Sequence, residues 1–140
     1  MEIAKNKEVE IVFPVHLNPN VQKTVFKMLS DTKNIHLIKP LDYPSFVWLM
    51  RKSSLIISDS GGIQEEAPSF NIPVLVTRET TERDEGIAAG YSFLVGTDTK
   101  KIVNVTNELL YSKRSLEPEP NPYGDGKACE KIIDFIKTHI

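Results

Sequence analysis

Five short apolar runs, separated by stretches with a helical pattern, constrain the fold of this chain most strongly. Each run is rich in β-branched residues, is too short for a helix, and lacks alternation with polar residues. Such runs are typical of strands buried on both faces of a parallel sheet. The runs are Val9–Phe13, Ile35–Ile38, Leu55–Ser58, Val74–Val76 and Phe93–Val95.

Helical patterns lie between these runs and follow the last of them. The expected helices are Pro19–Leu29, Pro44–Met50, Gly62–Phe70, Arg83–Ala89, Lys100–Tyr111 and Gly126–Ile140. The stretch Glu2–Lys5 resembles the tail of a helix, and the prolines of Ser115–Tyr123 predict a non-helical connection. The alternation of strand and helix predicts an α/β fold, a Rossmann-like parallel sheet flanked by helices, with residues 1–140 in one domain.

The composition excludes several classes of partner. Hydrophobic residues make up 40% of the chain, charged residues 26%, and the net charge of −2 creates no basic field for nucleic acid or anionic lipid. No apolar run is long enough for a membrane span or for a signal peptide. Cys129 is the only cysteine and the three histidines are scattered, so we expect no metal site. We expect a cytoplasmic protein that binds neither nucleic acid nor a membrane.

Ligands of open parallel sheets bind outside the carboxyl ends of the strands. The third run is followed by Ser60-Gly61-Gly62, whose glycines would let backbone amides at a helix start approach a phosphate closely. Glu66 follows Gly62 by one helical turn, about 6 Å along the axis, where a carboxylate could accept hydrogen bonds from a ribose. This spacing favours a nucleoside diphosphate. The alternative is a helix cap at Ser60 and a solvated carboxylate at Glu66.

Three further residues are candidates at the other strand ends. Arg83 could pair with phosphate or uracil oxygens, or with a neighbouring acid among Glu79, Glu82 and Asp84. Phe46 could stack on a base. His16 could donate to a phosphate or to a carbonyl of its own turn.

Trp48, two residues after Phe46, is interpreted as a core residue. Because all these segments follow successive strands, we expect them to converge on one edge of the sheet.

Several segments, in this order, resemble the non-hydrolysing UDP-N-acetylglucosamine 2-epimerases over nearly the whole chain. They are PVHLNPNV (Pro14–Val21), PLDYPSFVWLM (Pro40–Met50), DSGGIQEEAPS (Asp59–Ser69), TTER (Thr80–Arg83) and NPYGDGKA (Asn121–Ala128). Asp84 departs from the family pattern, which has proline after TTER, but an acid is acceptable at a helix start.

The resemblance implies that residues 1–140 are the UDP-binding C-terminal domain of a two-domain, glycosyltransferase-B-like protein. It implies that the Ser60–Gly62 turn holds the diphosphate and Glu66 the ribose, with the Leu41 backbone and Phe46 at the uracil. It further implies that Arg83 contacts the nucleotide. The residues implied for UDP are thus Leu41, Phe46, Ser60, Gly61, Gly62, Glu66 and Arg83. His16 matches a histidine that helps some bacterial members bind a second, regulatory UDP-N-acetylglucosamine.

The family's reaction inverts carbon 2 of the sugar, by anti elimination of UDP and its re-addition to the other face, and gives UDP-N-acetylmannosamine. The resemblance implies UDP-N-acetylglucosamine or UDP as partner, no cofactor, a homodimer for full-length members, and a place in cell-surface polysaccharide biosynthesis. The acids and bases belong to the family's N-terminal domain, so we expect no catalytic residue in this chain and no activity from it alone. Two alternatives stay open: another UDP-sugar enzyme of this architecture, such as a hydrolase or a glycosyltransferase, or a non-catalytic remnant.

The family's GHRRE segment precedes the matching region, and we expect the first strand of the sheet to be missing with it. In a sheet of order 3-2-1-4-5-6, this leaves Val9–Phe13 and Leu55–Ser58 on either side of the missing central strand. Unpaired strand edges are unfavourable. We therefore expect the two strands to pair directly, in the order 3-2-4-5-6. The alternative is pairing with another chain.

Overall fold

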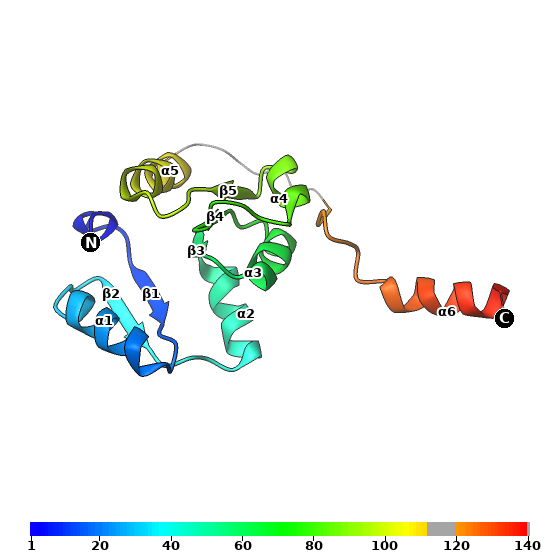
Figure 1. The fold of residues 1–140 in the computed structure, drawn as a ribbon, viewed down its shortest axis with the longest axis horizontal. Coiled ribbons are helices and arrows are strands. Elements are labelled where there is room, and N and C mark those ends of the chain that lie inside the picture. Colours follow the sequence, from blue (N-terminus) through cyan, green and yellow to red (C-terminus); the bar gives the residue numbers. More distant parts are fainter. Residues whose placement is uncertain (112–119, 140) are drawn as a thin grey trace. The chain divides into compact units, whose positions relative to one another are not determined.

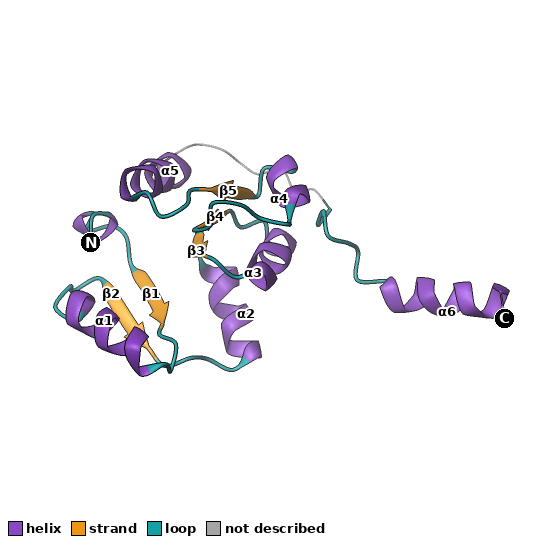
Figure 2. Ribbon diagram, viewed as in Figure 1, coloured by secondary structure: helices purple, strands orange, loops and turns teal. Residues whose placement is uncertain are grey.

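The computed structural model describes residues 1–111 and 120–139, and it has the expected alternation of parallel strands and helices (Figure 1 and Figure 2). Most element boundaries lie within two residues of those expected from the sequence. In chain order the elements are η1 (Ile3–Lys5), β1 (Ile11–Pro14), α1 (Pro19–Leu29), β2 (Ile35–Ile38), α2 (Tyr43–Lys52), β3 (Ile56–Ser58), α3 (Gly61–Glu66), η2 (Ala67–Phe70), β4 (Val74–Val76), α4 (Asp84–Ala88), β5 (Ser92–Leu94), α5 (Thr99–Tyr111) and α6 (Ala128–His139).

The described residues form two compact units, Met1–Leu49 and Met50–Ile140. The first unit contains the parallel pair β1–β2, with Ile11 opposite Ile35. Its helix α1 begins where the Asn18 side chain accepts a hydrogen bond of 2.9 Å from the backbone N–H of Asn20. An asparagine cap satisfies a donor that the first helical turn leaves unpaired, so this helix starts where the sequence predicts.

One asparagine ties the beginning of the first unit to the start of β2. The Asn34 side-chain amide nitrogen lies 3.1 Å from the carbonyl oxygen of Ala4, 3.1 Å from that of Asn6 and 2.8 Å from that of Val9. These carbonyls belong to η1 and to the segment between η1 and β1. A single side chain therefore satisfies backbone acceptors that no strand ladder reaches.

The second unit contains a three-stranded parallel sheet in the order β3-β4-β5. Its central strand β4 is fully buried, with Val74, Leu75 and Val76 each at 0% exposure. Val74 and Val76 form a core with Ala67 and Ile72. The side chains packed against this core are Ile56, Ile63, Phe70 and Leu94. The core thus lies directly under α3 and η2, and it fixes the β3–α3 turn.

Strand pairing differs from the expected closed sheet. The order 3-2-4-5-6 requires a β1–β3 ladder, but among the described residues β1 pairs only with β2, and β3 pairs only with β4. The expectation of direct closure is therefore wrong. Every observed pair joins strands that follow each other in the chain through one helical crossover, whereas a β1–β3 pair would have to close a longer loop around β2.

Two burial expectations are also wrong, that for the strands in part and that for Trp48 entirely. Burial on both faces holds for β4, but in β1 Val12 is 40% exposed and Phe13 36%. The two-stranded sheet of the first unit has fewer covering elements than the three-stranded sheet, where helices α3 and α5 contact β4. Trp48 is not a core residue: it is 62% exposed, on a helix whose fully buried side is occupied by Met50.

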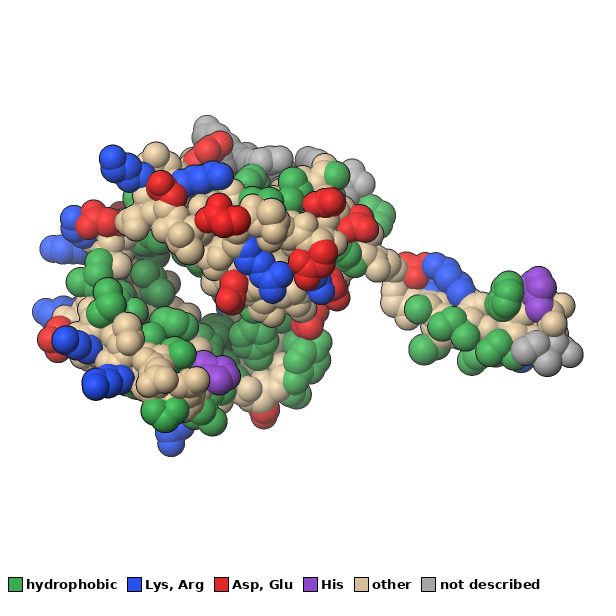
Figure 3. All heavy atoms as spheres, viewed as in Figure 1, with side chains coloured by type: hydrophobic (Ala, Val, Ile, Leu, Met, Phe, Trp, Pro, Cys, Tyr) green, Lys and Arg blue, Asp and Glu red, His purple; other side chains and the backbone are tan. Residues whose placement is uncertain are grey.

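The C-terminal helix α6 carries its apolar residues at the surface. Ile132, Ile133 and Ile136 are 58%, 49% and 47% exposed, and Figure 3 shows hydrophobic side chains along this helix. Of the expected non-helical stretch Ser115–Tyr123, residues 115–119 lie outside the described residues, and residues 120–123 are non-helical as expected. No helix in the described ranges has both the length and the apolarity of a bilayer span.

Candidate functional site

The turn between β3 and α3 brings together three of the candidate residues. Ser60 stands in an extended conformation just before α3, and its side chain makes no capping hydrogen bond to the start of that helix. A Cβ atom placed on Gly62 would lie 3.8 Å from Oε1 of Glu66 and 3.9 Å from Oγ of Ser60. The hydroxyl, the bare backbone and the carboxylate therefore share one face of α3, as the spacing predicts.

The guanidinium of Arg83 lies against Gly61. A Cβ atom on Gly61 would lie 2.6 Å from Cζ and 2.7 Å from Nη2 of Arg83, so only glycine leaves this space to the arginine. The Arg83 side chain is 23% exposed, and its Nε donates to Oε1 of Glu65 at 2.8 Å. The hydrogen bond to Glu65 raises the pKa of Arg83 above its ordinary value. A fixed positive charge therefore stands beside the turn.

Glu65 and Glu82 form ion pairs with Arg78 and Arg83 around this turn. Glu82 pairs with Arg83 and also with Arg78, whose Nη1 lies 3.2 Å from Oε2 of Glu82. A hydrogen bond from its own backbone N–H holds the pKa of Glu82 below its ordinary value, and the charge of Arg83 lowers it further. Of the three acids weighed as partners of Arg83, Glu82 is the one that pairs with it. Glu65 is a second partner. An anion that approaches Arg83 therefore competes with carboxylates of the chain itself.

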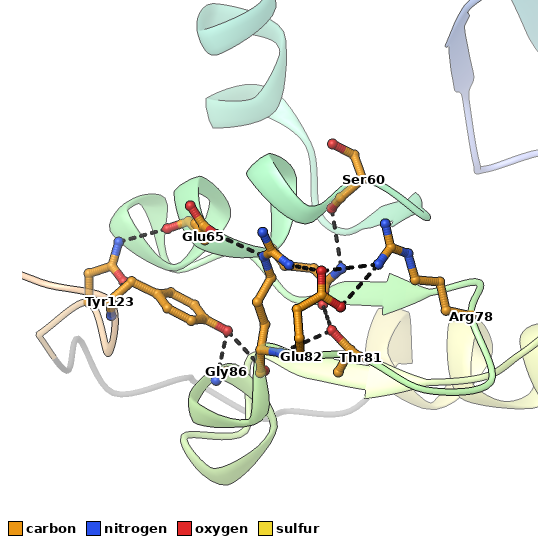
Figure 4. Close-up of polar contacts among 10 residues, drawn as sticks. Ser60, Glu65, Arg78, Thr81, Glu82, Gly86 and Tyr123 are labelled. Carbon is orange, nitrogen blue, oxygen red and sulfur yellow. Dashed lines mark hydrogen bonds and ion pairs between the residues drawn. The ribbon is translucent and has the colours of Figure 1, made fainter.

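A chain of hydrogen bonds links Ser60 to Arg83 through a buried glutamine (Figure 4). The Gln64 side chain is 0% exposed; its Nε2 donates to the Ser60 carbonyl at 3.3 Å, and its Oε1 accepts from the Thr81 hydroxyl at 2.8 Å. Oγ1 of Thr81 in turn accepts from the backbone N–H of Arg83 at 3.2 Å. Sequence reasoning missed Gln64 and Thr81, because neither one polar residue in an amphipathic helix nor one threonine in a loop gives a pattern.

Tyr123 closes the other side of Arg83. Its hydroxyl donates to the Arg83 carbonyl at 3.0 Å and accepts from the Gly86 backbone N–H at 2.9 Å. Its backbone N–H donates to Oδ1 of Asn121, whose Nδ2 lies 2.9 Å from the Glu65 carbonyl. Burial raises the pKa of Tyr123. The sequence singled out the NPYG segment only as part of a motif. In the structure, its Tyr123 contacts Arg83 and its Asn121 contacts Glu65, the ion-pair partner of Arg83.

The remaining candidates belong to the unit Met1–Leu49. His16 follows β1 and is exposed; its Nδ1 accepts from the backbone N–H of Asn18 at 3.1 Å. The turn carbonyl, one of the two partners considered for His16, is thus replaced by a turn amide, because the turn offers an N–H just before α1. This bond leaves Nε2 as the ring's donor in the neutral tautomer.

Leu41 and Phe46 flank the start of α2, where Leu41 is 38% exposed and Phe46 is half-buried. Oδ1 of Asp42 accepts from the backbone N–H of Ser45 at 3.0 Å, and hydrogen bonds from Ser45 lower the pKa of Asp42. This cap fixes the first turn of α2, from which Phe46 projects.

Comparisons with known proteins agree on one family. The family model described as UDP-N-acetylglucosamine 2-epimerase matches residues 1–137. The chain is 50% identical over 139 residues to the UDP-N-acetylglucosamine 2-epimerase of Salmonella typhimurium, covering 97% of this chain and 37% of the relative. It is 52% identical over 134 residues to that of Campylobacter jejuni, covering 94% and 35%. The chain thus spans little more than a third of the length of the curated relatives it matches.

Solved structures give the same result. A UDP-GlcNAc 2-epimerase from Neisseria meningitidis bound to UDP-GlcNAc superposes with a TM-score of 0.90 at 46% identity, covering 99% of this chain and 38% of that one. The enzyme from Methanocaldococcus jannaschii in complex with UDP-GlcNAc and UDP gives a TM-score of 0.82 at 33% identity, covering 98% and 38%.

Proposed function

Because this chain belongs to the UDP-N-acetylglucosamine 2-epimerase family, a family of isomerases, we propose that it supplies the UDP-binding wall of such an enzyme. The proposed activity of the whole protein is the interconversion of UDP-N-acetylglucosamine and UDP-N-acetylmannosamine, by anti elimination and re-addition of UDP. The observation that carries the proposal is the grouping of Ser60, Gly62 and Glu66 on one face of α3, with Arg83 against Gly61.

This grouping suits a protein that must hold UDP after it has left the sugar. The departing diphosphate gains negative charge, which hydroxyl and amide donors and a guanidinium stabilise. Ser60 and the Gly61–Gly62 backbone supply the donors, and Arg83 supplies the cation. The carboxylate of Glu66 accepts hydrogen bonds from the ribose hydroxyls and places the nucleoside relative to the phosphates.

Arg83 would bind the nucleotide by sharing its donors. Its Nε is occupied by Glu65, and its Nη1 pairs with Glu82. A guanidinium carries five N–H donors in a fixed plane, so a phosphate can replace Glu82 while Glu65 keeps the plane in place. The exchange of one anion for another implies a modest affinity for UDP.

The role of Glu66 can be tested by comparing two ligands that differ in the ribose. We expect Glu66→Ala to weaken UDP about tenfold, the loss typical of a hydrogen bond to a charged group, and to leave inorganic pyrophosphate nearly unchanged. Calorimetric or NMR titration of both ligands measures this. Glu108→Ala, on the exposed side of α5, is the control. An equal loss for both ligands would remove Glu66 from the ribose, and a wild-type chain that binds neither ligand would contradict the proposed function.

The proposal extends to the first unit through its candidate residues. Phe46 and the Leu41 backbone are proposed to contact uracil, and His16 is proposed to contact a phosphate of a second, regulatory nucleotide sugar. Phe46→Leu should then weaken uridine and UDP by the same factor and leave pyrophosphate unchanged. A homodimer of the whole protein is part of the same proposal.

A further inference from the structure

We propose that Tyr123 and Gln64 are positioning residues, which hold Arg83 in the orientation that the nucleotide site requires. The inference rests on the proposed contact between Arg83 and UDP. It assigns a role to two residues that touch Arg83 directly or through Thr81.

The backbone of Arg83 is held from both sides. Its N–H donates to Oγ1 of Thr81, which is itself bonded to the buried Gln64. Its carbonyl accepts from the hydroxyl of Tyr123 at 3.0 Å (Figure 4). Residue 83 precedes α4 in a non-helical conformation, with φ −116° and ψ 60°, so no helical hydrogen bond fixes it. The side-chain contacts take over that task.

The same two residues also connect Arg83 to the rest of the site. Gln64 donates to the carbonyl of Ser60 and accepts from Thr81, so the residue before α3 and the residue before α4 are joined through the buried Gln64 side chain and the Thr81 hydroxyl. Asn121, bonded to the backbone of Tyr123, donates to the carbonyl of Glu65, the ion-pair partner of Arg83. Hydrogen-bonded side chains in a partly buried network reinforce one another, so a single break is expected to loosen the guanidinium.

The space around Tyr123 fits this role. A Cβ atom on Gly86 would lie 2.5 Å from the tyrosine hydroxyl, so the glycine allows the phenol to approach the backbone of α4. The hydroxyl both donates and accepts, and its removal leaves the Gly86 N–H and the Arg83 carbonyl without this partner.

The test compares two tyrosines of the same unit. Tyr123→Phe removes the hydroxyl that holds Arg83. Tyr91→Phe removes a buried hydroxyl for which the described residues provide no hydrogen-bond partner. We expect Tyr123→Phe to raise the Kd for UDP about tenfold, and Tyr91→Phe to leave it unchanged. Thr81→Ser should retain wild-type affinity for UDP, because it keeps the hydroxyl between Gln64 and Arg83. Thr81→Val lacks this hydroxyl and should bind UDP more weakly.

Two readouts separate positioning from a general loss of stability. In an Arg83→Ala background, Tyr123→Phe should have no further effect on UDP binding, since the two changes act through one residue. In the ligand-free protein, exchange of the Arg83 side-chain Nε–H with solvent, followed by NMR, should be faster in Tyr123→Phe and in Gln64→Ala than in Tyr91→Phe. Unchanged exchange in both variants, or an undiminished Tyr123→Phe effect without Arg83, would overturn the inference. If the wild type does not bind UDP, the proposed function fails, and the exchange rates still decide whether the two residues position Arg83.

Discussion

At the residue scale, the space beside the first turn of α3 is shared by Gly61 and the guanidinium of Arg83. Gly61→Ala should push the guanidinium aside, because the atoms in the way are the far end of a flexible side chain. We expect a change of less than about 1 kcal/mol in the free energy of unfolding, since alanine suits a helix. UDP binding should nevertheless weaken about tenfold.

Thermal unfolding and UDP titration measure the two effects of Gly61→Ala separately. Gly62→Ala is a control for stability only, because its Cβ would meet ordinary van der Waals contacts and leave the Arg83–Glu65 pair in place, but Gly62 belongs to the proposed nucleotide face. Glu108→Ala, on the exposed side of α5, is the control for UDP affinity. Wild-type affinity in Gly61→Ala would show that Arg83 does not need its position against residue 61.

The phenol of Tyr123 gives a second prediction at this scale. Burial raises its pKa in the folded protein, so the fold binds this proton more tightly than the unfolded chain does. Its contribution to stability is therefore fully present below pH about 10, the ordinary tyrosine value, and is lost as pH rises through the folded pKa. Denaturant unfolding at pH values from neutral to alkaline should show a steeper loss in the wild type than in Tyr123→Phe. Parallel curves would contradict this.

Residues with a local signal could be predicted, and residues defined by distant contacts could not. The spacing from Gly62 to Glu66 fixes their common face through helix geometry alone. Nothing in the sequence pairs Arg83 with Glu65 or with Tyr123, because these contacts depend on how α3, α4 and the NPYG segment pack.

At the element scale, Asn34 joins η1 to the start of β2. Asn34→Asp replaces a donor with a carboxylate that faces the carbonyls of Ala4, Asn6 and Val9. We expect a loss of about 1–3 kcal/mol in the stability of the first unit, the usual effect of unsatisfied polar groups. Hydrogen exchange should rise over residues 1–49, and Asn107→Asp on the exposed side of α5 should change little. Equal protection in wild type and Asn34→Asp would contradict the role of Asn34.

The elements themselves were predicted well, and their pairing was predicted only between neighbours in the chain. Apolar runs and caps act locally, so α1 begins and ends at the expected residues. Pairing of β1 with β3 was expected from a general sheet order, and the order fails here because no local signal specifies which strands meet. The exposure of Trp48 could not be predicted for a related reason, because the hydrophobicity of a side chain does not show which face of its helix packs against another element.

At the scale of the whole molecule, we predict that the 140-residue chain alone does not convert UDP-N-acetylglucosamine. The site described here offers donors, a cation and a ribose acceptor, while the family's proton-transferring groups are expected in the N-terminal domain. NMR of the sugar signals, with a full-length relative as the positive control, measures the conversion. Turnover above a contamination control would place a catalytic group in this chain.

The contact between Gly86 and Tyr123 restricts the order in which these two positions can change over evolutionary time. While tyrosine stands at 123, any side chain at 86 meets its hydroxyl at 2.5 Å and that of Ser92 at 2.8 Å. A lineage must therefore lose the tyrosine hydroxyl and that of Ser92 before residue 86 can gain a side chain. Alanine at 86 then becomes favourable, since glycine within a helix costs about 1 kcal/mol. Once alanine stands at 86, its Cβ occupies the space of the tyrosine hydroxyl, so a return to tyrosine at 123 is unfavourable and the change becomes hard to reverse.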